Sequence, residues 1–427
     1  MKTINSPYTE LKNYIDKTIN KDKSLYVTSN DEPTPLDCVE EMISRLPPSI
    51  FKNRNLEVFD PCCGNGNFFI PLYFSLLQYH KPQEIVEKML HFNDINEDRL
   101  AVVKQIFGVD GFKTNITNYD FLSNDIDNKL YDLIMCNPPY AKFSKNGNRA
   151  SKNHNLVGDF IDRSLRKTKP GGYLLFIVPN NWMSYSRRNK LITQLTELQF
   201  HYLNIHTAKK YFKHIGSSFT WFVLQNKKFY KPIQIEGIWK NKEYTSMVNS
   251  QVRKYIPLFY NKLIQSIINK TLDAPSKKFL VETTSDLHRH TKKKVIQNHR
   301  DEEYRHRLIH TPSQTCWSKI PHKYQKGYKV FISLSSYYKV FVDNCGMTQS
   351  IAFIRCENKK EAEGICDTLK HPLYVFLNDI CRYGNFNNVL ILKSFPYVNS
   401  RTDVYNTLHI TKTEQLFIEQ NFKYRGS

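Results

Sequence analysis

The sequence predicts an α/β fold with a mostly parallel sheet in its first half and a mixed α+β region in its second half. Between residues 55 and 224, short apolar runs alternate with segments of helical apolar spacing, which is the rhythm of βαβ units. The first apolar run leads into a glycine-containing turn, FDPCCGNGNFF (59–69). After Tyr230 the alternation stops and the composition becomes more polar. These three observations set the order of the elements below.

The expected strands and helices follow each other along the first half of the chain. Five strands are expected at LEVFD (56–60), MLHFND (89–94), GFKTNITNYDF (111–121), LYDLIMC (130–136) and GGYLLFIVP (171–179). Helices are expected at FFIPLYFSLLQY (68–79), INEDRLAVVKQIF (95–107) and FIDRSLRKT (160–168). In such a sheet, ligands bind beyond the carboxyl ends of the strands. Residues that follow these runs are therefore the candidates for a site.

The length of the chain indicates two domains. A chain of 427 residues exceeds what one hydrophobic core usually serves. We place the boundary between Asn226 and Gly237, which gives domains at 1–230 and 231–427. Within the second domain, GYKVFISLSSYYKVFVDN (327–344) is typical of strands and EAEGICDTLKHPLYVFLNDIC (361–381) has helical spacing.

Positive charge is concentrated in the second half. The chain carries 61 basic and 40 acidic residues, a net charge of +21. Residues 1–230 hold 30 basic and 23 acidic residues, so 31 basic and 17 acidic residues remain, and the halves carry +7 and +14. Excess charge of this size favours a polyanionic partner, with nucleic acid ahead of a membrane surface. Solubility alone is the alternative explanation, and runs such as Lys292 to Lys294 are often solvated faces.

Other composition features point to an intracellular protein. The first residues, MKTINSPYTELKNYIDK, lack an apolar stretch of signal-peptide length, and the longest apolar runs are too short to span a bilayer. The nine cysteines form no CxxC pair, and their odd number argues against a full disulfide framework. We expect reduced cysteines, a cytoplasmic location, no membrane association and no metal site.

Three acidic residues follow three successive expected strands. Asp60 precedes the turn with Gly64 and Gly66, Asp94 ends the second strand, and Asp120 with Phe121 ends the third. Glycines allow close backbone approach to a ligand, an acid at the second strand suits a ribose diol, and Asp120 with Phe121 suits an adenine. A plain tight turn is the alternative for the glycines. The third glycine of the dinucleotide fingerprint and a Gly-Lys-Ser/Thr sequence are both missing, so NAD and a nucleoside triphosphate fit less well.

The fourth strand runs into NPPY (137–140). Pro138 and Pro139 cannot continue the strand and fix two φ angles, so the Asn137 side chain, the Pro138 carbonyl and the Tyr140 ring leave the sheet in a preset arrangement. A strand-ending turn without chemistry is the alternative.

Taken together, these motifs resemble a known family. DPCCGNGNF (60–68) resembles the cofactor motif of S-adenosylmethionine-dependent methyltransferases, and NPPY resembles the catalytic motif of adenine-N6 DNA methyltransferases. TPLDCVEEMI (34–43) ahead of the cofactor motif, and a large C-terminal region, are similar to the gamma class. The resemblance implies a Rossmann-like methyltransferase domain, a C-terminal target-recognition domain, S-adenosyl-L-methionine as cofactor and double-stranded DNA as partner. It further implies a monomer, and it leaves open whether the protein is the modification enzyme of a restriction-modification system with a cognate restriction endonuclease or an orphan or viral relative.

The resemblance also implies a role for each motif residue. Asp60, Gly64 and Gly66 would hold the methionine part of the cofactor, Asp94 its ribose, and Asp120 with Phe121 its adenine, and Ile95 would also contact the cofactor. Thr34 and Pro35 would close over the methionine end, and Asn137 would also touch the cofactor. Phe212, with Phe219 as its rival, would stack on an extruded base together with Tyr140. Core packing of either phenylalanine is the alternative.

The chemistry of an adenine amine explains the catalytic motif. Its lone pair is delocalised into the ring, so acceptors for its two hydrogens are needed, and Asn137 Oδ1 with the Pro138 carbonyl would supply them. Tyr140 would stack on the base after it leaves the duplex, while Pro139, on the same substrate side, serves the turn. Three alternatives stay open: a protein-glutamine methyltransferase, an RNA adenine methyltransferase, and a non-catalytic DNA-specificity subunit.

Overall fold

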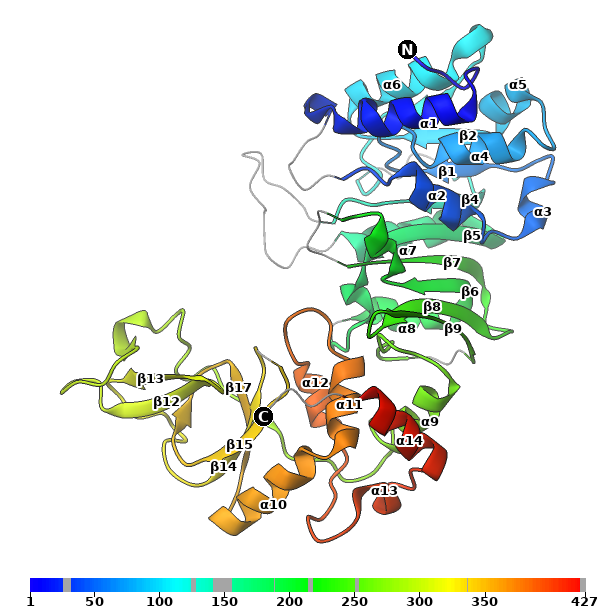
Figure 1. The fold of residues 1–427 in the computed structure, drawn as a ribbon. Coiled ribbons are helices and arrows are strands. Elements are labelled where there is room, and N and C mark those ends of the chain that lie inside the picture. Colours follow the sequence, from blue (N-terminus) through cyan, green and yellow to red (C-terminus); the bar gives the residue numbers. More distant parts are fainter. Residues whose placement is uncertain are drawn as a thin grey trace. The chain divides into compact units, whose positions relative to one another are not determined.

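The computed structural model describes residues 1–25, 32–123, 128–140, 156–187, 189–213, 218–249, 253–335 and 337–422 (Figure 1). The chain forms two compact units. The N-terminal unit comprises Met1–Trp182 and Lys190–Arg253, and the C-terminal unit comprises Met183–Asn189 and Lys254–Ser427.

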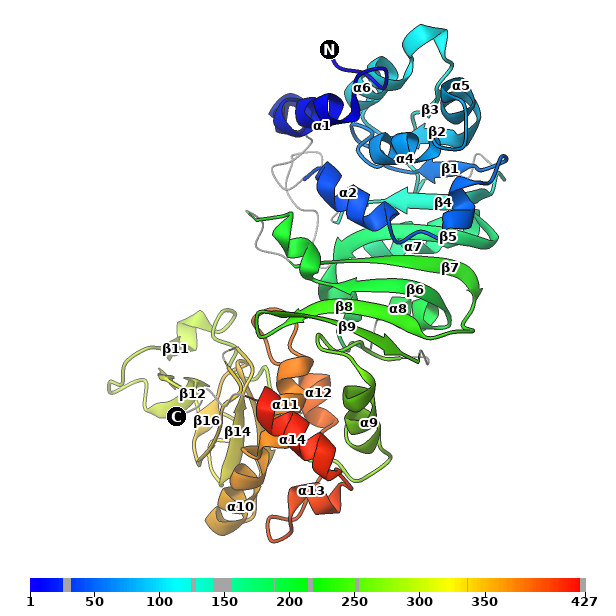
Figure 2. The same cartoon turned by 45° about the vertical axis from the view of Figure 1, so that its right-hand side comes forward.

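One sheet organises the N-terminal unit. Its nine strands are β1 (Val58–Asp60), β2 (Leu90–Asn93), β3 (Asn115–Thr117), β4 (Tyr131–Cys136), β5 (Thr168–Pro179), β6 (Leu198–Ile205), β7 (Phe219–Lys228), β8 (Ile233–Trp239) and β9 (Lys242–Val248). They lie in the order β3-β2-β1-β4-β5-β7-β6-β8-β9 (Figure 2). The predicted α/β fold with a mostly parallel sheet is confirmed.

Five neighbouring strands of this sheet are parallel. β3, β2, β1, β4 and β5 pair in parallel, whereas β7 inserts antiparallel between β5 and β6. β4 is buried except at Asp132, because a central strand covered on both faces must be apolar throughout. The carboxyl ends of β1 to β4 therefore share one edge of the sheet.

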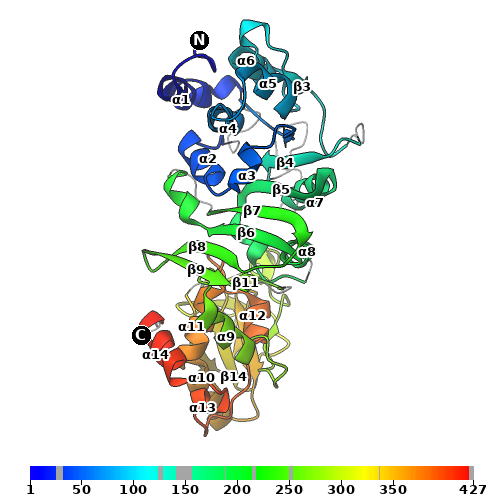
Figure 3. The same cartoon turned by 90° about the vertical axis from the view of Figure 1, so that its right-hand side faces the viewer.

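Helices cover both faces of the sheet. They are α1 (Tyr8–Lys17), α2 (Leu36–Ile43), α3 (Pro48–Phe51), α4 (Phe69–Leu76), α5 (Pro82–Glu84), α6 (Glu97–Phe107), α7 (Val157–Lys167) and α8 (Lys190–Thr196). α2 and α4 lie on one face and α7 and α8 on the other (Figure 3). The Asn96 side chain caps α6 by accepting hydrogen bonds from the backbone amides of Asp98 and Arg99, which explains why this helix begins within INED.

The N-terminal unit extends past the expected boundary near residue 230. β8 pairs in parallel with β6, and β9 pairs antiparallel with β8, so both strands belong to the large sheet. The compact unit consequently ends at Arg253. β9 is an edge strand whose residues are mostly exposed, so its sequence has no strong apolar pattern, and the placement of a domain boundary between Asn226 and Gly237 stays a prediction.

The C-terminal unit contains two small sheets and a group of helices. Its strands are β10 (Glu282–Thr283), β11 (Ile296–Gln297), β12 (His306–Thr311), β13 (Gln314–Ser318), β14 (Lys329–Ser333), β15 (Val340–Asp343), β16 (Gly346–Met347) and β17 (Ile351–Arg355). Its helices are α9 (Lys262–Lys270), α10 (Lys359–Leu369), α11 (Pro372–Ile380), α12 (Val389–Lys393), α13 (Val404–Thr407) and α14 (Lys412–Asn421). One sheet has the order β10-β17-β14-β15 and the other β11-β13-β12-β16, which confirms a mixed α+β region. Among the described helices, none combines the length and the apolar character needed to cross a bilayer.

Candidate active site at the carboxyl ends of the parallel strands

The glycine turn after β1 is held against the end of β2. Gly64 and Gly66 have φ values of 53° and 82°, a region that side chains with a Cβ rarely adopt. The Gly64 amide donates a hydrogen bond to Asp94 Oδ2 at 2.8 Å, and the Asn96 amide donates to Asp94 Oδ1 at 2.9 Å. A Cβ on Gly66 would meet Phe107 Cε2 at 3.2 Å. The turn thus needs both glycines, and Asp94 fixes its position.

Asp60 is a buried carboxyl without a cationic partner in the described residues. Only 1% of its surface is exposed, and its Oδ1 accepts a hydrogen bond from the Cys62 amide at 3.1 Å. Burial, with a smaller contribution from Asp94, raises the pKa of Asp60 well above its usual value, while the Cys62 amide acts in the opposite direction. A ligand with positive charge would therefore stabilise the ionised form of this carboxyl.

Asn137 is held by a distant segment, residues 32–34, and by the nearby Tyr140. Its Nδ2 donates to Thr34 Oγ1 at 3.0 Å and to the Glu32 carbonyl at 3.3 Å. Its Oδ1 accepts a hydrogen bond from the Tyr140 hydroxyl at 2.5 Å. The Thr34 carbonyl in turn accepts from Asn67 Nδ2 at 2.8 Å. This chain of contacts joins the glycine turn, the start of α2 and the NPPY motif, so three predicted motifs meet at one place. Pro35 is the N-cap residue of α2 next to this contact.

Tyr140, which contacts Asn137, is the first of three aromatic rings that neighbour one another in a row. The Tyr140 and Phe219 ring centroids are 5.9 Å apart, and those of Phe219 and Phe212 are 4.6 Å apart. Phe219 is therefore the direct neighbour of Tyr140, and Phe212 contacts Tyr140's neighbour. Both phenylalanines are buried, and residues 214–217, which separate them in the sequence, lie outside the described residues.

Three further residues that are predicted to contact the cofactor, Ile95, Asp120 and Phe121, differ in exposure. Ile95 is 68% exposed, which is unusual for a large apolar side chain directly after a buried strand. Asp120 is exposed, and its Oδ1 accepts from the Leu122 amide at 2.9 Å. Phe121 is buried, with ring centroids 5.8 Å from Phe59 and 5.6 Å from Phe160. The Phe121 ring is part of the core beside the site, and Ile95 is the apolar side chain that this edge presents.

Two residues of this site were not predicted from the sequence. Asn93 Nδ2 donates to the Pro61 carbonyl at 2.9 Å and to the Tyr119 carbonyl at 3.0 Å, so it ties together the segments after β1, β2 and β3. Its signal is a polar residue in the apolar run LHFN. Asn67, which binds the Thr34 carbonyl, lies within the glycine motif itself.

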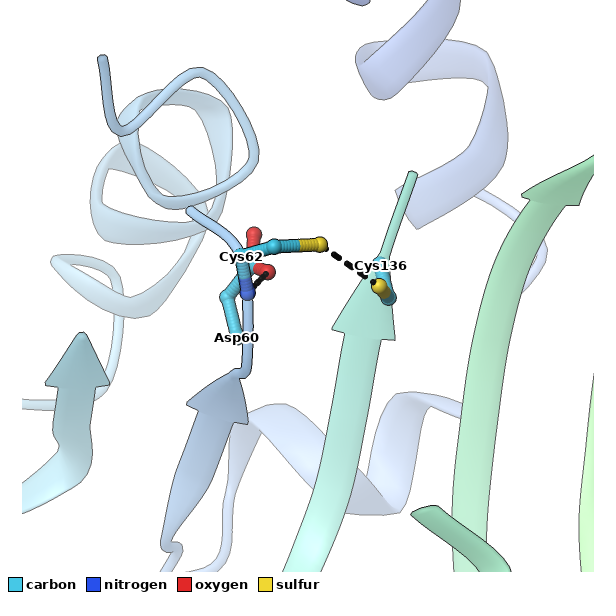
Figure 4. A group of neighbouring side chains, drawn as sticks. All are labelled: Asp60, Cys62 and Cys136. Atoms are coloured by element: carbon cyan, nitrogen blue, oxygen red, sulfur yellow. Dashed lines mark hydrogen bonds between the residues drawn. The ribbon is translucent and has the colours of Figure 1, made fainter. Parts of the chain in front are cut away.

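Two thiols meet between β1 and β4. Cys62 Sγ lies 3.2 Å from Cys136 Sγ, and Asp60 is in the same group (Figure 4). Burial raises the pKa of the Cys136 thiol to about 11. Both cysteines are free, as are the other seven.

The comparisons with known proteins match parts of this chain to a restriction-modification methylase family, to a Type II methyltransferase and to an uncharacterized protein. The family described as "Eco57I restriction-modification methylase" matches residues 70–212, about a third of the chain, which includes Asp94, Asp120 and NPPY but not the glycine turn. The Type II methyltransferase M.VspI from Vibrio sp. (strain 343) is 29% identical over 183 residues, covering 39% of this chain and 42% of the relative. The uncharacterized protein YtxK of Bacillus subtilis (strain 168) is 25% identical over 174 residues, 38% of this chain and 49% of the relative. This chain thus spans less than half the length of these two curated relatives.

Solved structures share the fold. The Type IIL restriction-modification enzyme MmeI, in complex with DNA, has a TM-score of 0.55 and 12% identity, covering 96% of this chain and 68% of that chain. The ATP-dependent Type ISP restriction-modification enzyme LlaBIII, bound to DNA, has a TM-score of 0.57 and 12% identity, covering 100% of this chain and 41% of that one.

The residues at this edge of the sheet suit S-adenosylmethionine as a ligand. S-adenosylmethionine carries a sulfonium and an ammonium, and Asp60 is a buried carboxyl with no salt bridge in the described part of the chain. At this edge of the sheet, the glycine turn presents its backbone and Ile95 presents an exposed apolar side chain. The fold is shared with the restriction-modification enzymes MmeI and LlaBIII, and the residues at the carboxyl ends of the parallel strands fit S-adenosylmethionine as a cofactor.

Proposed function

We propose that this protein is a site-specific DNA methyltransferase that methylates N6 of an adenine flipped out of double-stranded DNA. The observation that carries the proposal is the set of hydrogen bonds that holds the Asn137 amide between Thr34 and Tyr140 at the carboxyl end of β4. A strand-ending turn would not require a side chain from a segment about a hundred residues away to orient that amide. The matched restriction-modification methylase family supports DNA as the substrate.

The residues of the NPPY motif would prepare the amine for attack. Asn137 Oδ1 and the Pro138 carbonyl accept hydrogen bonds from the two N6 hydrogens, which draws the nitrogen towards tetrahedral geometry. The cofactor, when bound, would supply an electrophilic methyl group on a sulfonium. As the N–C bond forms, the S–CH3 bond would break to leave a thioether, and the proton lost by N6 would pass to solvent. Asn137 Oδ1 accepts a hydrogen bond from the Tyr140 hydroxyl, so the N6 amine would replace that hydroxyl at Oδ1. Tyr140 and Phe219 then offer ring faces to the base.

The cofactor residues have distinct proposed roles. Asp60, Gly64 and Gly66 bind the methionine part, Asp94 binds the ribose, and Ile95 with Asp120 lies on the adenine side. Thr34 orients Asn137 and is a positioning residue, which differs from the expected closure over the methionine end. Phe121 supports this edge from the core.

A third of the net charge of the chain lies in one short part of the C-terminal unit. Residues 286–330 contain eleven lysines and arginines and four acids, a net charge of +7 out of +21. This segment includes β11, β12 and β13 of the sheet β11-β13-β12-β16. Lys292, Lys293 and Lys294 are exposed and make no salt bridge within the residues that the structure describes. We therefore place phosphate contacts on this sheet, and sequence recognition in the C-terminal unit.

A transfer assay tests the proposed substrate class. The purified full chain with methyl-labelled S-adenosylmethionine is expected to label double-stranded DNA. It should leave RNA and glutamine-containing protein substrates unlabelled. Label in RNA or in protein glutamine, with none in DNA, would contradict the proposal. Cofactor binding without transfer to any of them would favour a DNA-specificity subunit instead.

Replacement of Asp94 is expected to weaken cofactor binding first. In Asp94→Ala both the proposed ribose contact and the anchor of the Gly64 amide are lost. Hydrogen bonds to charged groups contribute about 1.5–3 kcal/mol, so the Kd for S-adenosylhomocysteine should rise by about ten- to a hundredfold. Calorimetry measures this change. An unaltered Kd in a folded variant would remove Asp94 from the cofactor site.

Replacement of Thr34 tests its role as a positioning residue. Thr34→Val has nearly the same shape but cannot accept the hydrogen bond from Asn137 Nδ2. A typical hydrogen bond contributes about 1 kcal/mol, so kcat should fall by about five- to tenfold while the Kd for cofactor stays within about twofold. Thr34→Ser retains the hydroxyl and should retain kcat. Equal losses in both variants would show that packing, not the hydrogen bond, is what matters at this position.

A further inference from the structure

The segment after β1 and the end of β4 bring three metal-ligating groups together. Asp60 is the last residue of β1, Cys62 follows it by two residues, and Cys136 is the last residue of β4. β1 and β4 are parallel neighbours, with Phe59 opposite Ile134, so their carboxyl ends lie side by side. One ligand atom from each of the three residues lies within 4.8 Å of the others (Figure 4).

We propose that Asp60, Cys62 and Cys136 form a binding site for a thiophilic divalent cation such as Zn²⁺, and that the bound ion excludes the cofactor. Binding of the ion does not depend on the proposed function. The competition does, because it rests on the assignment of Asp60 to the cofactor.

The choice of ion follows from the ligand set. Two sulfurs and one carboxylate oxygen suit Zn²⁺, whereas Mg²⁺ and Ca²⁺ prefer oxygen ligands throughout. Zinc sites with three protein ligands keep a fourth position for water or another group. The Asn137 carbonyl oxygen lies 3.5 Å from Cys62 Sγ and is a candidate for that position.

The distance between the two sulfurs fits a metal better than a bond between them. Two thiolates at about 2.3 Å from a tetrahedral zinc lie about 3.8 Å apart. The sulfurs are 3.2 Å apart here, so each needs to move by only a few tenths of an ångström. A disulfide would require an approach to about 2.05 Å, which is a larger movement at the end of a central strand.

The binding reaction involves no oxidant or reductant. The S–H bonds of Cys62 and Cys136 break, two S–metal bonds form, and both protons pass to solvent. Asp60 donates an oxygen lone pair to the ion. While Asp60 is a ligand of the ion, it cannot serve the positive end of the cofactor.

A titration with Co²⁺ tests the site without DNA and without turnover. The reduced full chain, freed of reductant under argon, should develop thiolate-to-cobalt charge-transfer absorption that saturates at one ion per chain. Cys62→Ala and Cys136→Ala should each weaken Co²⁺ binding more than about 100-fold, since the loss of outer partners alone costs ten- to a hundredfold. Cys63→Ala, the matched control, changes a buried neighbouring cysteine outside the group and should retain the absorption.

A second measurement tests the competition. Zn²⁺ at saturation should raise the Kd of S-adenosylhomocysteine by at least about tenfold in the wild type, as expected for ligands that share Asp60, and should leave it unchanged in Cys62→Ala. Circular dichroism and cofactor binding show whether each variant is folded, and Cys62→Ser and Cys136→Ser replace a variant that is not. Absence of charge-transfer absorption in the wild type, or its persistence in both ligand variants, would overturn the site. Simultaneous binding of ion and cofactor would overturn only the proposed competition. Failure of DNA methylation would not bear on the cobalt titration, which tests the ion site by itself.

Discussion

Asn137→Ala is expected to lower kcat by about 10²- to 10³-fold, the range found when one preset hydrogen-bonding group is removed from an active site. The variant removes the acceptor for one N6 hydrogen and the group that Thr34 and Tyr140 hold in place. Because the amide is assigned to the base and not chiefly to the cofactor, the Kd for S-adenosylhomocysteine should change by no more than about threefold. Single-turnover assays and calorimetry measure the two quantities separately.

Asn137→Asp is the matched control for this variant. It retains an oxygen acceptor but loses the Nδ2 donor that binds Thr34 Oγ1 and the Glu32 carbonyl. We expect activity between those of the wild type and the alanine variant. If the alanine variant loses cofactor affinity to the same extent as Asp94→Ala, the division between an amine-binding asparagine and a cofactor-binding aspartate is wrong.

Replacement of Lys292, Lys293 and Lys294 by glutamine should weaken binding to all DNA sequences alike. Each phosphate contact contributes about −0.9 to the slope of log K against log salt, so three contacts contribute about −2.7 and, at about 0.1 M salt, an affinity factor of about 10²- to 10³-fold. The variant should therefore have a flatter salt slope. Fluorescence anisotropy with one labelled duplex over a range of salt concentrations measures it.

A control for charge comes from the same unit. Lys359 and Lys360 are exposed at the start of α10, a helix that packs on β14 and β15. Their replacement by glutamine removes positive charge away from the sheet β11-β13-β12-β16 and should leave the slope nearly unchanged. Equal slopes for the wild type and the triple variant would assign Lys292 to Lys294 to a solvated face without a phosphate contact.

The strands that carry the site could be predicted because each has a strong local signal. β1, β2, β4 and β5 contain apolar runs that end at, or directly before, an acid, an asparagine or a proline, and such runs are typical of central parallel strands. The order of the motifs along the chain then places their ends on one edge. Glycine conformations and the N-cap of α6 follow equally from local sequence.

The hairpin of β8 and β9 could not be predicted with the same rules. Its turn residues, Lys240 and Asn241, have φ values of 48° and 65°, a combination for which sequences usually provide Asn-Gly or Asp-Gly. Apolar and polar residues alternate only in the first half of β8, β9 has no regular alternation, and most of β9 is exposed. The signal for this edge of the sheet comes from pairing with β6, which a single sequence does not reveal.

Contacts between distant segments were the other part that sequence reasoning missed. Thr34 and Asn137 are 103 positions apart, and Cys62 and Cys136 are 74 apart. Spacing rules for metal ligands or capping motifs apply to residues within a few turns of each other, so neither pair has a local pattern. Both pairs arise because the start of α2 and the ends of β1 and β4 meet at one edge of the sheet.

Nucleoside analysis of methylated DNA tests the central claim most directly. Genomic DNA from a methylation-free host is incubated with the purified protein and S-adenosylmethionine carrying a deuterated methyl group, then digested to nucleosides and analysed by mass spectrometry. The proposed role of Asn137 and Pro138 predicts deuterated N6-methyl-2′-deoxyadenosine as the dominant product, and its absence after digestion of DNA treated with Asn137→Ala. Deuterated N4-methyl-2′-deoxycytidine as the dominant product, or no labelled nucleoside from the wild type, would contradict it.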